Sequence, residues 1–285
     1  MVDDTPDAPP PPPGIDTTVP SVARLYDYAL GGKNNYAADR EAAERMLAVL
    51  PEAHLIAHAN RAFLGRAVDA MCEAGIDQFL DIGAGLPAQN PVHEVARRHH
   101  PDARVVYVDN DPVVRVHAEA LLADRSDVTG VLQADMRDPE TVFAHPEVTA
   151  RLDLSRPVGL LLVAMLHVLD DAQQPFALMR RYLDHLPAGS LVAISHAEND
   201  THPERARFLE ESYRATSASG QIRSRAEIGR FFDDMTLLEP GLVHVGDWRP
   251  RADEPYYAPE QAWILGGLGR WEGGRGAGDG SGDAR

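Results

Sequence analysis

Three aspartates stand at the ends of short apolar segments in the middle of the chain. Asp81 lies near the end of QFLDI, Asp109 ends VVYVD, and Asp135 ends GVLQAD. If these segments are parallel strands, their carboxyl ends meet at one edge of a sheet, where ligands of open α/β folds bind. Carboxylates at that edge repel phosphate and attract a cation. The pattern therefore predicts a site for a positively charged ligand that carries no phosphate.

The turn after the first segment carries two glycines. It reads DIGAGLP from Asp81 to Pro87, and glycines at such a turn allow a tight bend and a close approach of the backbone to a ligand. Gly83-x-Gly85-x-x-Ala88 also fits the dinucleotide fingerprint, which is a weak signal by itself. A nicotinamide cofactor stays an alternative, but its pyrophosphate would meet the carboxylate of Asp81.

The two later aspartates suit the other parts of a nucleoside. Asp109 lies 24 residues after Gly85 and can accept hydrogen bonds from both ribose hydroxyls, and the adjacent Asn110 is assigned to the same site. Asp135 can accept a hydrogen bond from an exocyclic amine beside the apolar side chain of Met136. S-adenosyl-L-methionine has these parts and no phosphate. No Cys/His group has zinc-ligand spacing, so no metal is expected.

A doubly wound α/β fold would position these residues. After Gly75, short apolar runs alternate with helical stretches, which implies right-handed crossovers and a mainly parallel sheet. Seven strands are expected, at 78–82, 105–108, 130–134, 158–164, 190–195, 242–245 and 263–267. Helices are expected at 91–99, 112–122, 139–144, 175–185, 204–215 and 225–232. Asn90, Asp111 and Asp138 each precede a proline and are predicted N-caps.

Both ends of the chain differ in composition from the middle. Residues 1–19 are rich in proline and acids, and residues 272–285 are rich in glycine, so both are predicted to be disordered tails. Residues 20–75 show helical apolar spacing and form a predicted N-terminal extension, in which Pro51 breaks one helix and Gly75 ends another. The ligand-binding α/β domain is expected at 76–271.

Charge and composition narrow the classes of partner. The 285 residues include 27 Lys+Arg and 44 Asp+Glu, a net charge of −17, which disfavours nucleic acid and anionic membrane surfaces. No apolar run has membrane-spanning length, and the acidic start is unlike a signal peptide. The single cysteine, Cys72, favours a reducing cytoplasm. The oligomeric state stays open.

Longer stretches of the sequence resemble a known family. PSVARLYDYALGGKNNYAADREAAE, NRAFLGRAV, GIDQFLDIGAGLP, VVYVDNDP and GSLVAISH are similar to the actinobacterial S-adenosyl methyltransferase-like family, over about residues 21 to 270. The D-x-G-x-G turn and the later acids also resemble class I S-adenosylmethionine-dependent methyltransferases. The resemblance implies their Rossmann-like fold and a cofactor held by Asp81, Gly83, Gly85, Asp109, Asp135 and Met136. It implies no particular acceptor.

This chain departs from the family pattern at two positions. Asn34 stands where the GGKDN pattern has Asp, and Ala84 stands where Thr is common. Neither change removes a glycine or a strand-end acid, so the expected cofactor site is kept.

Two histidines are candidates for chemistry. His167 ends the apolar run VGLLLVAMLH, which contains the fourth predicted strand, and His196 follows the fifth, at the rim where an acceptor would approach. Imidazole titrates near neutrality and can take a proton, although a histidine at a strand end also serves to orient a loop. Methyl transfer is an in-line displacement for which a base is optional.

The leading interpretation is methyl transfer to a small-molecule acceptor. The alternatives are an NAD(P)-dependent oxidoreductase and a non-catalytic S-adenosylmethionine-binding protein.

A polar and aromatic segment precedes the predicted helices of the extension. Tyr28, Lys33 and Tyr36 flank the helix-breaking pair Gly31-Gly32, and loops of this composition are common in binding lids. The three side chains are therefore predicted to cover the cofactor or the acceptor. The alternative is a solvated connection with tyrosines packed on the sheet.

Overall fold

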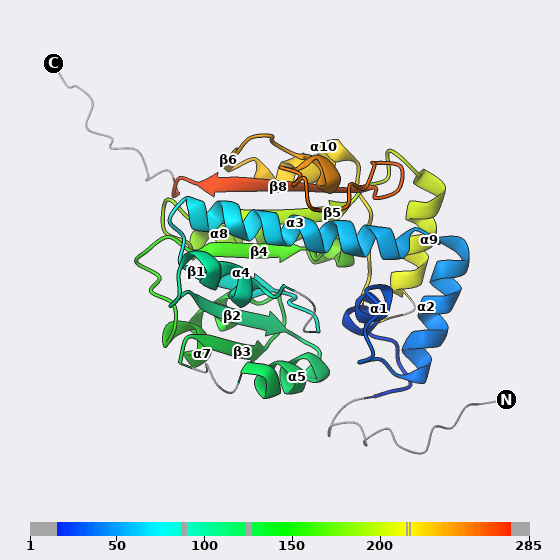
Figure 1. Cartoon of the computed structure of the whole chain (residues 1–285), viewed down its shortest axis with the longest axis horizontal. Coiled ribbons are helices and arrows are strands. Elements are labelled where there is room, and N and C mark those ends of the chain that lie inside the picture. The colour runs from blue at the N-terminus through cyan, green and yellow to red at the C-terminus, as the bar shows by residue number, and fades with distance from the viewer. Residues whose placement is uncertain (1–15, 87–89, 123–126, 215, 217, 275–285) are drawn as a thin grey trace.

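A sheet with the strand order β3-β2-β1-β4-β5-β8-β6, in which β7 also pairs with β8, forms the centre of the molecule (Figure 1). The computed structural model describes residues 16–86, 90–122, 127–214, 216 and 218–274. Most of both predicted tails, 1–15 and 275–285, lies outside the described residues, as does Ala88 of the fingerprint. The strands are β1 Gln78–Ile82, β2 Arg104–Asp109, β3 Thr129–Gln133, β4 Gly159–Val163, β5 Leu191–Ala197, β6 Met235–Leu237, β7 Val243–His244 and β8 Ile264–Trp271.

The strand directions confirm the expected α/β class. The five strands β1 to β5 pair in parallel, whereas β8 runs antiparallel to β5, β6 and β7. The eighth strand, β6, was not expected, because it has three residues, pairs only with β8 and is half-exposed or exposed. The order reverses at β1, whose neighbours are β2 and β4. In such folds the ligand site lies outside the carboxyl ends of the strands at this point.

The segment around Tyr28, expected to be a loop ahead of the helices of the extension, contains a helix at 22–29. The helices otherwise agree with the expected pattern, with one short addition at 146–149. They are α1 Val22–Ala29, α2 Ala37–Val49, α3 Ala53–Glu73, α4 Val92–His99, α5 Pro112–Leu122, α6 Pro139–Ala144, α7 Pro146–Thr149, α8 Pro175–Asp184, α9 Pro203–Arg214 and α10 Arg225–Gly229, with short 3₁₀ turns η2 Leu166–Val168, η3 Asp171–Gln173, η4 Arg230–Phe232 and η5 Val245–Asp247. None of the helices in the described part of the chain is both long enough and apolar enough to cross a bilayer.

Two of the three predicted N-caps are confirmed. Asp138 accepts a hydrogen bond from Thr141 N (3.2 Å), and Asp111 Oδ1 accepts one from Val113 N (2.9 Å). The prediction for Asn90 was wrong. Its backbone is left-handed, with φ 52°, while an N-cap needs extended backbone, so Pro91 caps α4 and Asn90 Oδ1 accepts from Arg98.

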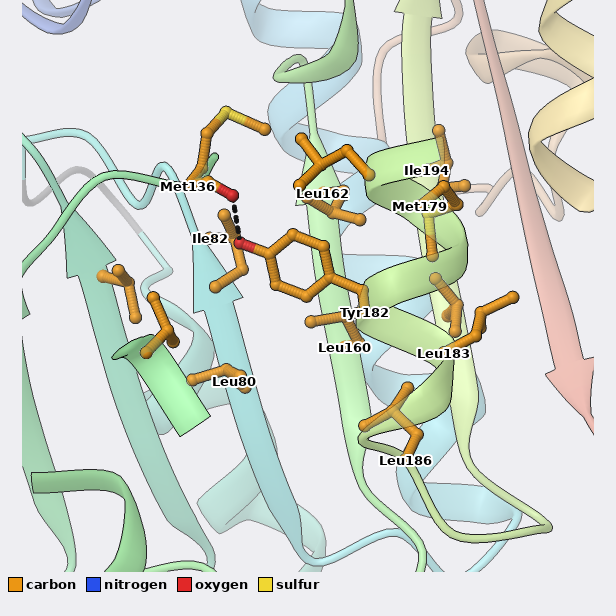
Figure 2. Close-up of a cluster of buried hydrophobic side chains, with 14 of the residues drawn as sticks. Leu80, Ile82, Met136, Leu160, Leu162, Met179, Tyr182, Leu183, Leu186 and Ile194 are labelled. Atoms are coloured by element: carbon orange, nitrogen blue, oxygen red, sulfur yellow. Dashed lines mark hydrogen bonds between the residues drawn. The ribbon is translucent and has the colours of Figure 1, made fainter. Parts of the chain in front are cut away.

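Helices cover both faces of the sheet, and the alternation of side chains along β1 divides the core. Phe79 points toward α3 and α4, while Leu80 and Ile82 belong to the cluster under α6 and α8. Figure 2 shows Tyr182 of α8 between Leu160 and Ile82, with its hydroxyl directed at the carbonyl of Met136. The fully buried strands require this cover on both sides.

The N-terminal helices lie in two different places. Helix α3 runs across β4 and β5, while α1 and α2 lie beyond the carboxyl end of β2 (Figure 1). Gly75 ends α3 with φ 91°, and Ile76 N donates to the carbonyl of Met71 (3.0 Å), as a glycine-terminated helix requires. The extension therefore contributes both to the core and to the edge where the strands end.

Candidate active site

One cavity lies at the carboxyl ends of β1, β2, β3 and β4. It brings together the cofactor-binding residues that were predicted at the ends of the first three strands, although these residues come from three separate segments of the chain. The cavity lining includes Asp81, Gly83, Gly85, Asp109, Asn110, Asp135 and Met136. The parallel pairing of β1, β2 and β3 accounts for this, because it aligns the strand ends at one edge.

Asp81 is a buried carboxylate without a hydrogen-bond donor. It is 5% exposed, on the α3 side of β1, and no described residue donates a hydrogen bond to its side chain. Burial raises the pKa of Asp81 to about 7, the charge of Asp109 raises it further, and Arg61 opposes the shift. A buried carboxylate in this state favours a cationic partner, because a cation would restore the charged form.

The glycine turn has left-handed backbone at both glycines. Gly83 has φ 70° and Gly85 has φ 66°, where other residues are strained. A Cβ at Gly83 would lie 2.0 Å from Met165 Sδ, whereas a Cβ at Gly85 would meet nothing within 4 Å. Gly83 is therefore packed against a side chain, and Gly85 opens the backbone to the cavity.

Asp109 anchors this turn as well as lining the cavity. Its Oδ2 accepts a hydrogen bond from Gly85 N (2.9 Å), and its Oδ1 accepts one from Asp111 N (2.9 Å). Burial raises the pKa of Asp109 to about 6, and these backbone bonds limit the shift. Each carboxylate oxygen has two lone pairs, so Asp109 keeps acceptor sites for a ligand. Asn110 beside it is exposed at the cavity.

Asp135 already has a partner, which the sequence interpretation missed. Arg137 Nε donates to both carboxylate oxygens at 2.9 Å, and this hydrogen bonding lowers the pKa of Asp135. The neighbouring Met136 is buried, and its carbonyl accepts the Tyr182 hydroxyl at 2.7 Å (Figure 2). The loop after β3 is thus fixed from both the surface and the core.

The N-terminal segment reaches the cavity, but through other residues than predicted. Tyr28, Lys33 and Tyr36 are absent from the cavity lining, to which α1 and the residue before it contribute Ser21, Val22, Ala23 and Tyr26. Lys33 is exposed, and the Tyr36 ring lies under the Arg24 guanidinium at 5.2 Å. Tyr26 lies against α3, where its hydroxyl bonds to the carbonyl of Ala57 and to Asn60, and it lines the cavity, whereas Tyr28, two residues later in α1, does not.

Asn34, which departs from the family pattern, acts through its backbone. Its N–H donates to Asp27 Oδ2 (3.0 Å), a contact that aspartate at this position would also make.

Helix α3 contributes lining residues that were not predicted. Asn60, Arg61 and Leu64 line the cavity, and they lie on one face of the helix at a spacing of three to four residues. The stretch NRAFLGRAV contains all three. The similarity of this stretch to the family was the one signal in the sequence that could have identified these residues. Helical periodicity alone does not indicate which face of a helix meets a ligand.

His167 and His196 are inside the protein and are not among the residues that line the cavity. Strand β4 ends at Val163, earlier than expected, and His167 lies in η2, where its Nδ1 accepts from Ala197 N at 3.2 Å. His196 lies within β5, whose pairing continues to Ala197.

Burial lowers the pKa of His167 to about 3 and that of His196 well below its ordinary value. Both imidazoles are therefore neutral and bonded within the fold.

Comparison with known proteins decides the class. A family model described as S-adenosyl methyltransferase matches residues 9–272. The chain belongs to this family. S-adenosyl-L-methionine is its cofactor and methyl transfer its activity, and nothing supports the nicotinamide or non-catalytic alternatives.

Two solved structures are similar to this methyltransferase over nearly its whole length. A DUF574 family protein from Streptomyces avermitilis is 38% identical, with a TM-score of 0.85, and the match covers 90% of this chain and 99% of that one. A candidate methyltransferase from Thermobifida fusca is 41% identical, with a TM-score of 0.85 and coverage of 92% and 98%.

More distant similarity extends to the fold alone. An O-methyltransferase family protein from Burkholderia thailandensis is 15% identical, with a TM-score of 0.51 over 76% of this chain and 59% of that one. No functionally curated protein matches this methyltransferase. Across the residues with described positions, no three or more His, Cys, Asp or Glu side chains are grouped to hold a metal ion.

Proposed function

We propose that this methyltransferase transfers the methyl group of S-adenosyl-L-methionine to a small-molecule acceptor that binds in the cavity at the strand ends. One observation carries the proposal: a buried carboxylate without a donor among the described residues, a turn that opens its backbone to the cavity at Gly85, and two further aspartates line the same cavity. This set of carboxylate acceptors suits a cationic, phosphate-free nucleoside.

The lining residues suggest a role for each part of the cofactor. Asp81 would accept the ammonium group, and Arg61, which reaches the cavity from α3, would take the carboxylate of the same amino acid. Asp109 and Asn110 would bind the ribose hydroxyls.

Adenine would lie against Met136. Asp135 shares its charge with Arg137, so it offers the adenine amine one of its remaining lone pairs and not a free carboxylate.

When bound, S-adenosyl-L-methionine supplies a methyl group on a positively charged sulfur. The task of the protein is then to align an acceptor and to exclude water. Since His167 and His196 do not line the cavity, we assign them to holding the ends of β4 and β5 together. Tyr26 and Val22 of α1 line the cavity and support a covering role for the extension at 20–75.

The rest of the cavity wall indicates the kind of acceptor. It is largely apolar, with Gln173 as a polar exception, and comes from α1, from the end of β4 and the segment after it, and from the segment after α9: Val22, Val163, Met165, Val168, Leu169 and Ala218. Such a wall favours a small, mostly apolar molecule. The net charge of −17 disfavours nucleic acid. Cys72 is buried and unpaired, in keeping with a reducing cytoplasm.

Isothermal calorimetry tests the proposal. We expect micromolar or tighter binding of S-adenosyl-L-methionine, and a loss of about 1–3 kcal/mol in Asp109→Ala, which removes hydrogen bonds to a charged acceptor. Asp253→Ala, which removes an exposed acid away from the cavity, is the matched control. Absence of heat with both the cofactor and its demethylated product would end the proposal. A metabolite screen for methyl release then identifies the acceptor.

A further inference from the structure

Ala164, directly after β4, has a left-handed backbone with φ 58°. Alanine rarely adopts this conformation, because its Cβ crowds the carbonyl that follows. Backbone strain of this kind persists only where the surroundings enforce it, and it is concentrated at functional sites. Ala164 lines the cavity, so the contacts that hold it bear on the site.

A continuous series of hydrogen bonds holds Ala164 in this conformation. Its N–H donates to the carbonyl (3.2 Å) and to the Oγ (2.8 Å) of Ser195 in β5. Ser195 Oγ donates to Asn60 Oδ1 (2.5 Å), and Asn60 Nδ2 donates to the Tyr26 hydroxyl (3.0 Å), which donates to the carbonyl of Ala57 (3.0 Å). We call Ser195, Asn60 and Tyr26 the Ser–Asn–Tyr chain. It ties α1 and α3 to the end of β4.

The consequence of this backbone is the position of the next side chain. Met165 lies directly over Gly83, since a Cβ at Gly83 would come within 2.0 Å of its Sδ and 2.3 Å of its Cε. Met165 and Gly83 line the same cavity as Asp81 and Asp109. Gly83 lies between Asp81 and Gly85, whose N–H donates to Asp109 Oδ2, so the thioether packs against the turn that joins the two aspartates.

We infer that the Ser–Asn–Tyr chain positions the Met165 thioether against the methyl group of the bound cofactor. This inference rests on the proposed function, in which the ammonium group meets Asp81 and the ribose meets Asp109, so that the sulfonium lies between them. A thioether is soft and polarisable. It therefore attracts the methyl group on the cationic sulfur of S-adenosyl-L-methionine more strongly than it attracts the neutral sulfur of S-adenosyl-L-homocysteine. Met165 is thus a specificity determinant for the methylated cofactor, and the three chain residues are positioning residues.

The role of Met165 is tested by Met165→Leu, which keeps the side-chain volume and removes the sulfur. We measure dissociation constants for S-adenosyl-L-methionine and S-adenosyl-L-homocysteine by calorimetry. We expect the affinity for the methylated cofactor to fall three- to tenfold and that for the product to stay within twofold. A change of both affinities by the same factor would overturn the role of Met165.

The positioning role is tested by Ser195→Ala, which should shift the same ratio in the same direction. Ser190→Ala is the matched control, because Ser190 is equally buried in the adjoining segment and its Oγ accepts from Val158 N (3.0 Å) before the other end of β4. Ser190→Ala should lower the unfolding temperature and leave the ratio unchanged. If the two serine variants alter the ratio equally, the Ser–Asn–Tyr chain has no special role.

A double-variant cycle makes the test independent of stability. Ala164→Gly relieves the left-handed strain, so Ser195→Ala should change the ratio less than half as much in that background as in the wild type. An equal change in both backgrounds would overturn the link through Ala164. If the wild-type protein binds neither ligand, the proposed function fails too; if it binds both and the ratio never moves, only this inference fails.

Discussion

The strand-end cavity and a cluster around His167 and His196 both contain buried titratable groups, but only the groups of the cavity face open space. In the cavity, Asp81 has a raised pKa and no donor among the described residues. In the histidine cluster, formed by His167, His196 and Arg223, the pKa of each histidine is lowered and each side chain is bonded within the fold. A perturbed pKa therefore indicates a binding group here only where the group also lines the cavity, as Asp81 does and the two histidines do not.

Arg223 is the centre of the histidine cluster. It is 1% exposed and donates to Asp171 (2.7 Å), to the carbonyls of Leu166 and Leu169, and to His196 Nε2 (3.3 Å). Its guanidinium also lies over the Phe231 ring at 5.8 Å. These contacts fasten the segment after β4 to β5.

The largest loss of stability should come from a substitution in the histidine cluster, whose polar groups are hydrogen-bonded within the fold. Arg223→Met leaves buried carbonyls without donors, so the free energy of unfolding should fall by roughly 3 kcal/mol, while cofactor affinity changes less than threefold. Denaturant unfolding and calorimetry measure the two quantities. Arg207→Met, which removes a surface pair with Glu204, should stay within about 0.5 kcal/mol. A large loss of cofactor affinity in Arg223→Met would contradict this prediction and show that the histidine cluster and the cavity act as one site.

Removing the carboxylate of Asp81, which has no donor among the described residues, should affect cofactor binding and not reduce stability. Asp81→Asn should weaken cofactor binding by about 2–4 kcal/mol, because a buried charge-assisted bond to the ammonium group is lost. Asp77→Asn, which alters an exposed acid paired with Arg156, is the control and should leave binding unchanged. Equal cofactor affinities in the wild type and Asp81→Asn would show that Asp81 does not bind the cofactor.

The same substitution should stabilise the ligand-free protein. Folding raises the pKa of Asp81 to about 7, so its stabilising contribution is complete below the unfolded pKa of about 4 and is lost as the pH rises through about 7. At pH 8 the wild type therefore carries a buried charge that asparagine lacks. We expect Asp81→Asn to be more stable there by about 2–4 kcal/mol and equal to the wild type at pH 4.

Cofactor affinity should depend on pH in the direction set by Asp81. Binding of an ammonium group requires the ionised carboxylate, so below pH 7 the affinity should fall about tenfold, or about 1.4 kcal/mol, for each pH unit. Asp109, with its pKa raised to about 6, should steepen the fall below pH 6. Calorimetry between pH 5 and 7.5 measures the slope, and Asp81→Asn should flatten it between pH 6 and 7. A flat wild-type profile would contradict the proposed pairing.

The smallest effect should come from the contact between core and cavity in Figure 2. Tyr182→Phe removes the donor to the carbonyl of Met136, which should cost about 1 kcal/mol of stability and weaken the cofactor two- to fivefold. Tyr256→Phe removes an exposed hydroxyl bond to Asp247 and should do neither. Unchanged affinity in Tyr182→Phe would show that Met136 needs no anchor.

The strand-end half of the cavity was predictable from the sequence because its signals are local. An apolar run of strand length followed by an acid specifies the end of a parallel strand, and parallel pairing brings such ends together whatever their separation in the chain. Asp81, Asp109 and Asp135 needed no knowledge of packing beyond this. The pairing of Asp135 with Arg137 depends on a side-chain rotamer, which no pattern specifies.

The other half of the cavity could not be predicted from the sequence because it depends on tertiary packing. Asn60 and Arg61 reach the cavity only because α3 lies across β4 and β5, and the helical pattern does not state where the helix docks. The apolar run up to His167 predicted strand as far as Ala164, but the left-handed backbone at Ala164 ends β4 and turns His167 inward. A non-glycine residue in this conformation leaves no signature in the sequence.

The packing of α3 also bears on how the chain is synthesised. Arg66 donates to the carbonyl of Trp248, 182 residues later, and the Phe63 ring lies 2.8 Å from where a Cβ at Gly266 would be. At about 5–20 residues per second, the ribosome delivers these late contacts roughly 10–40 s after α3 itself. One apolar side of α3 therefore stays uncovered until the segment with Trp248 and β8 has been synthesised, and the core around α3 is completed only then.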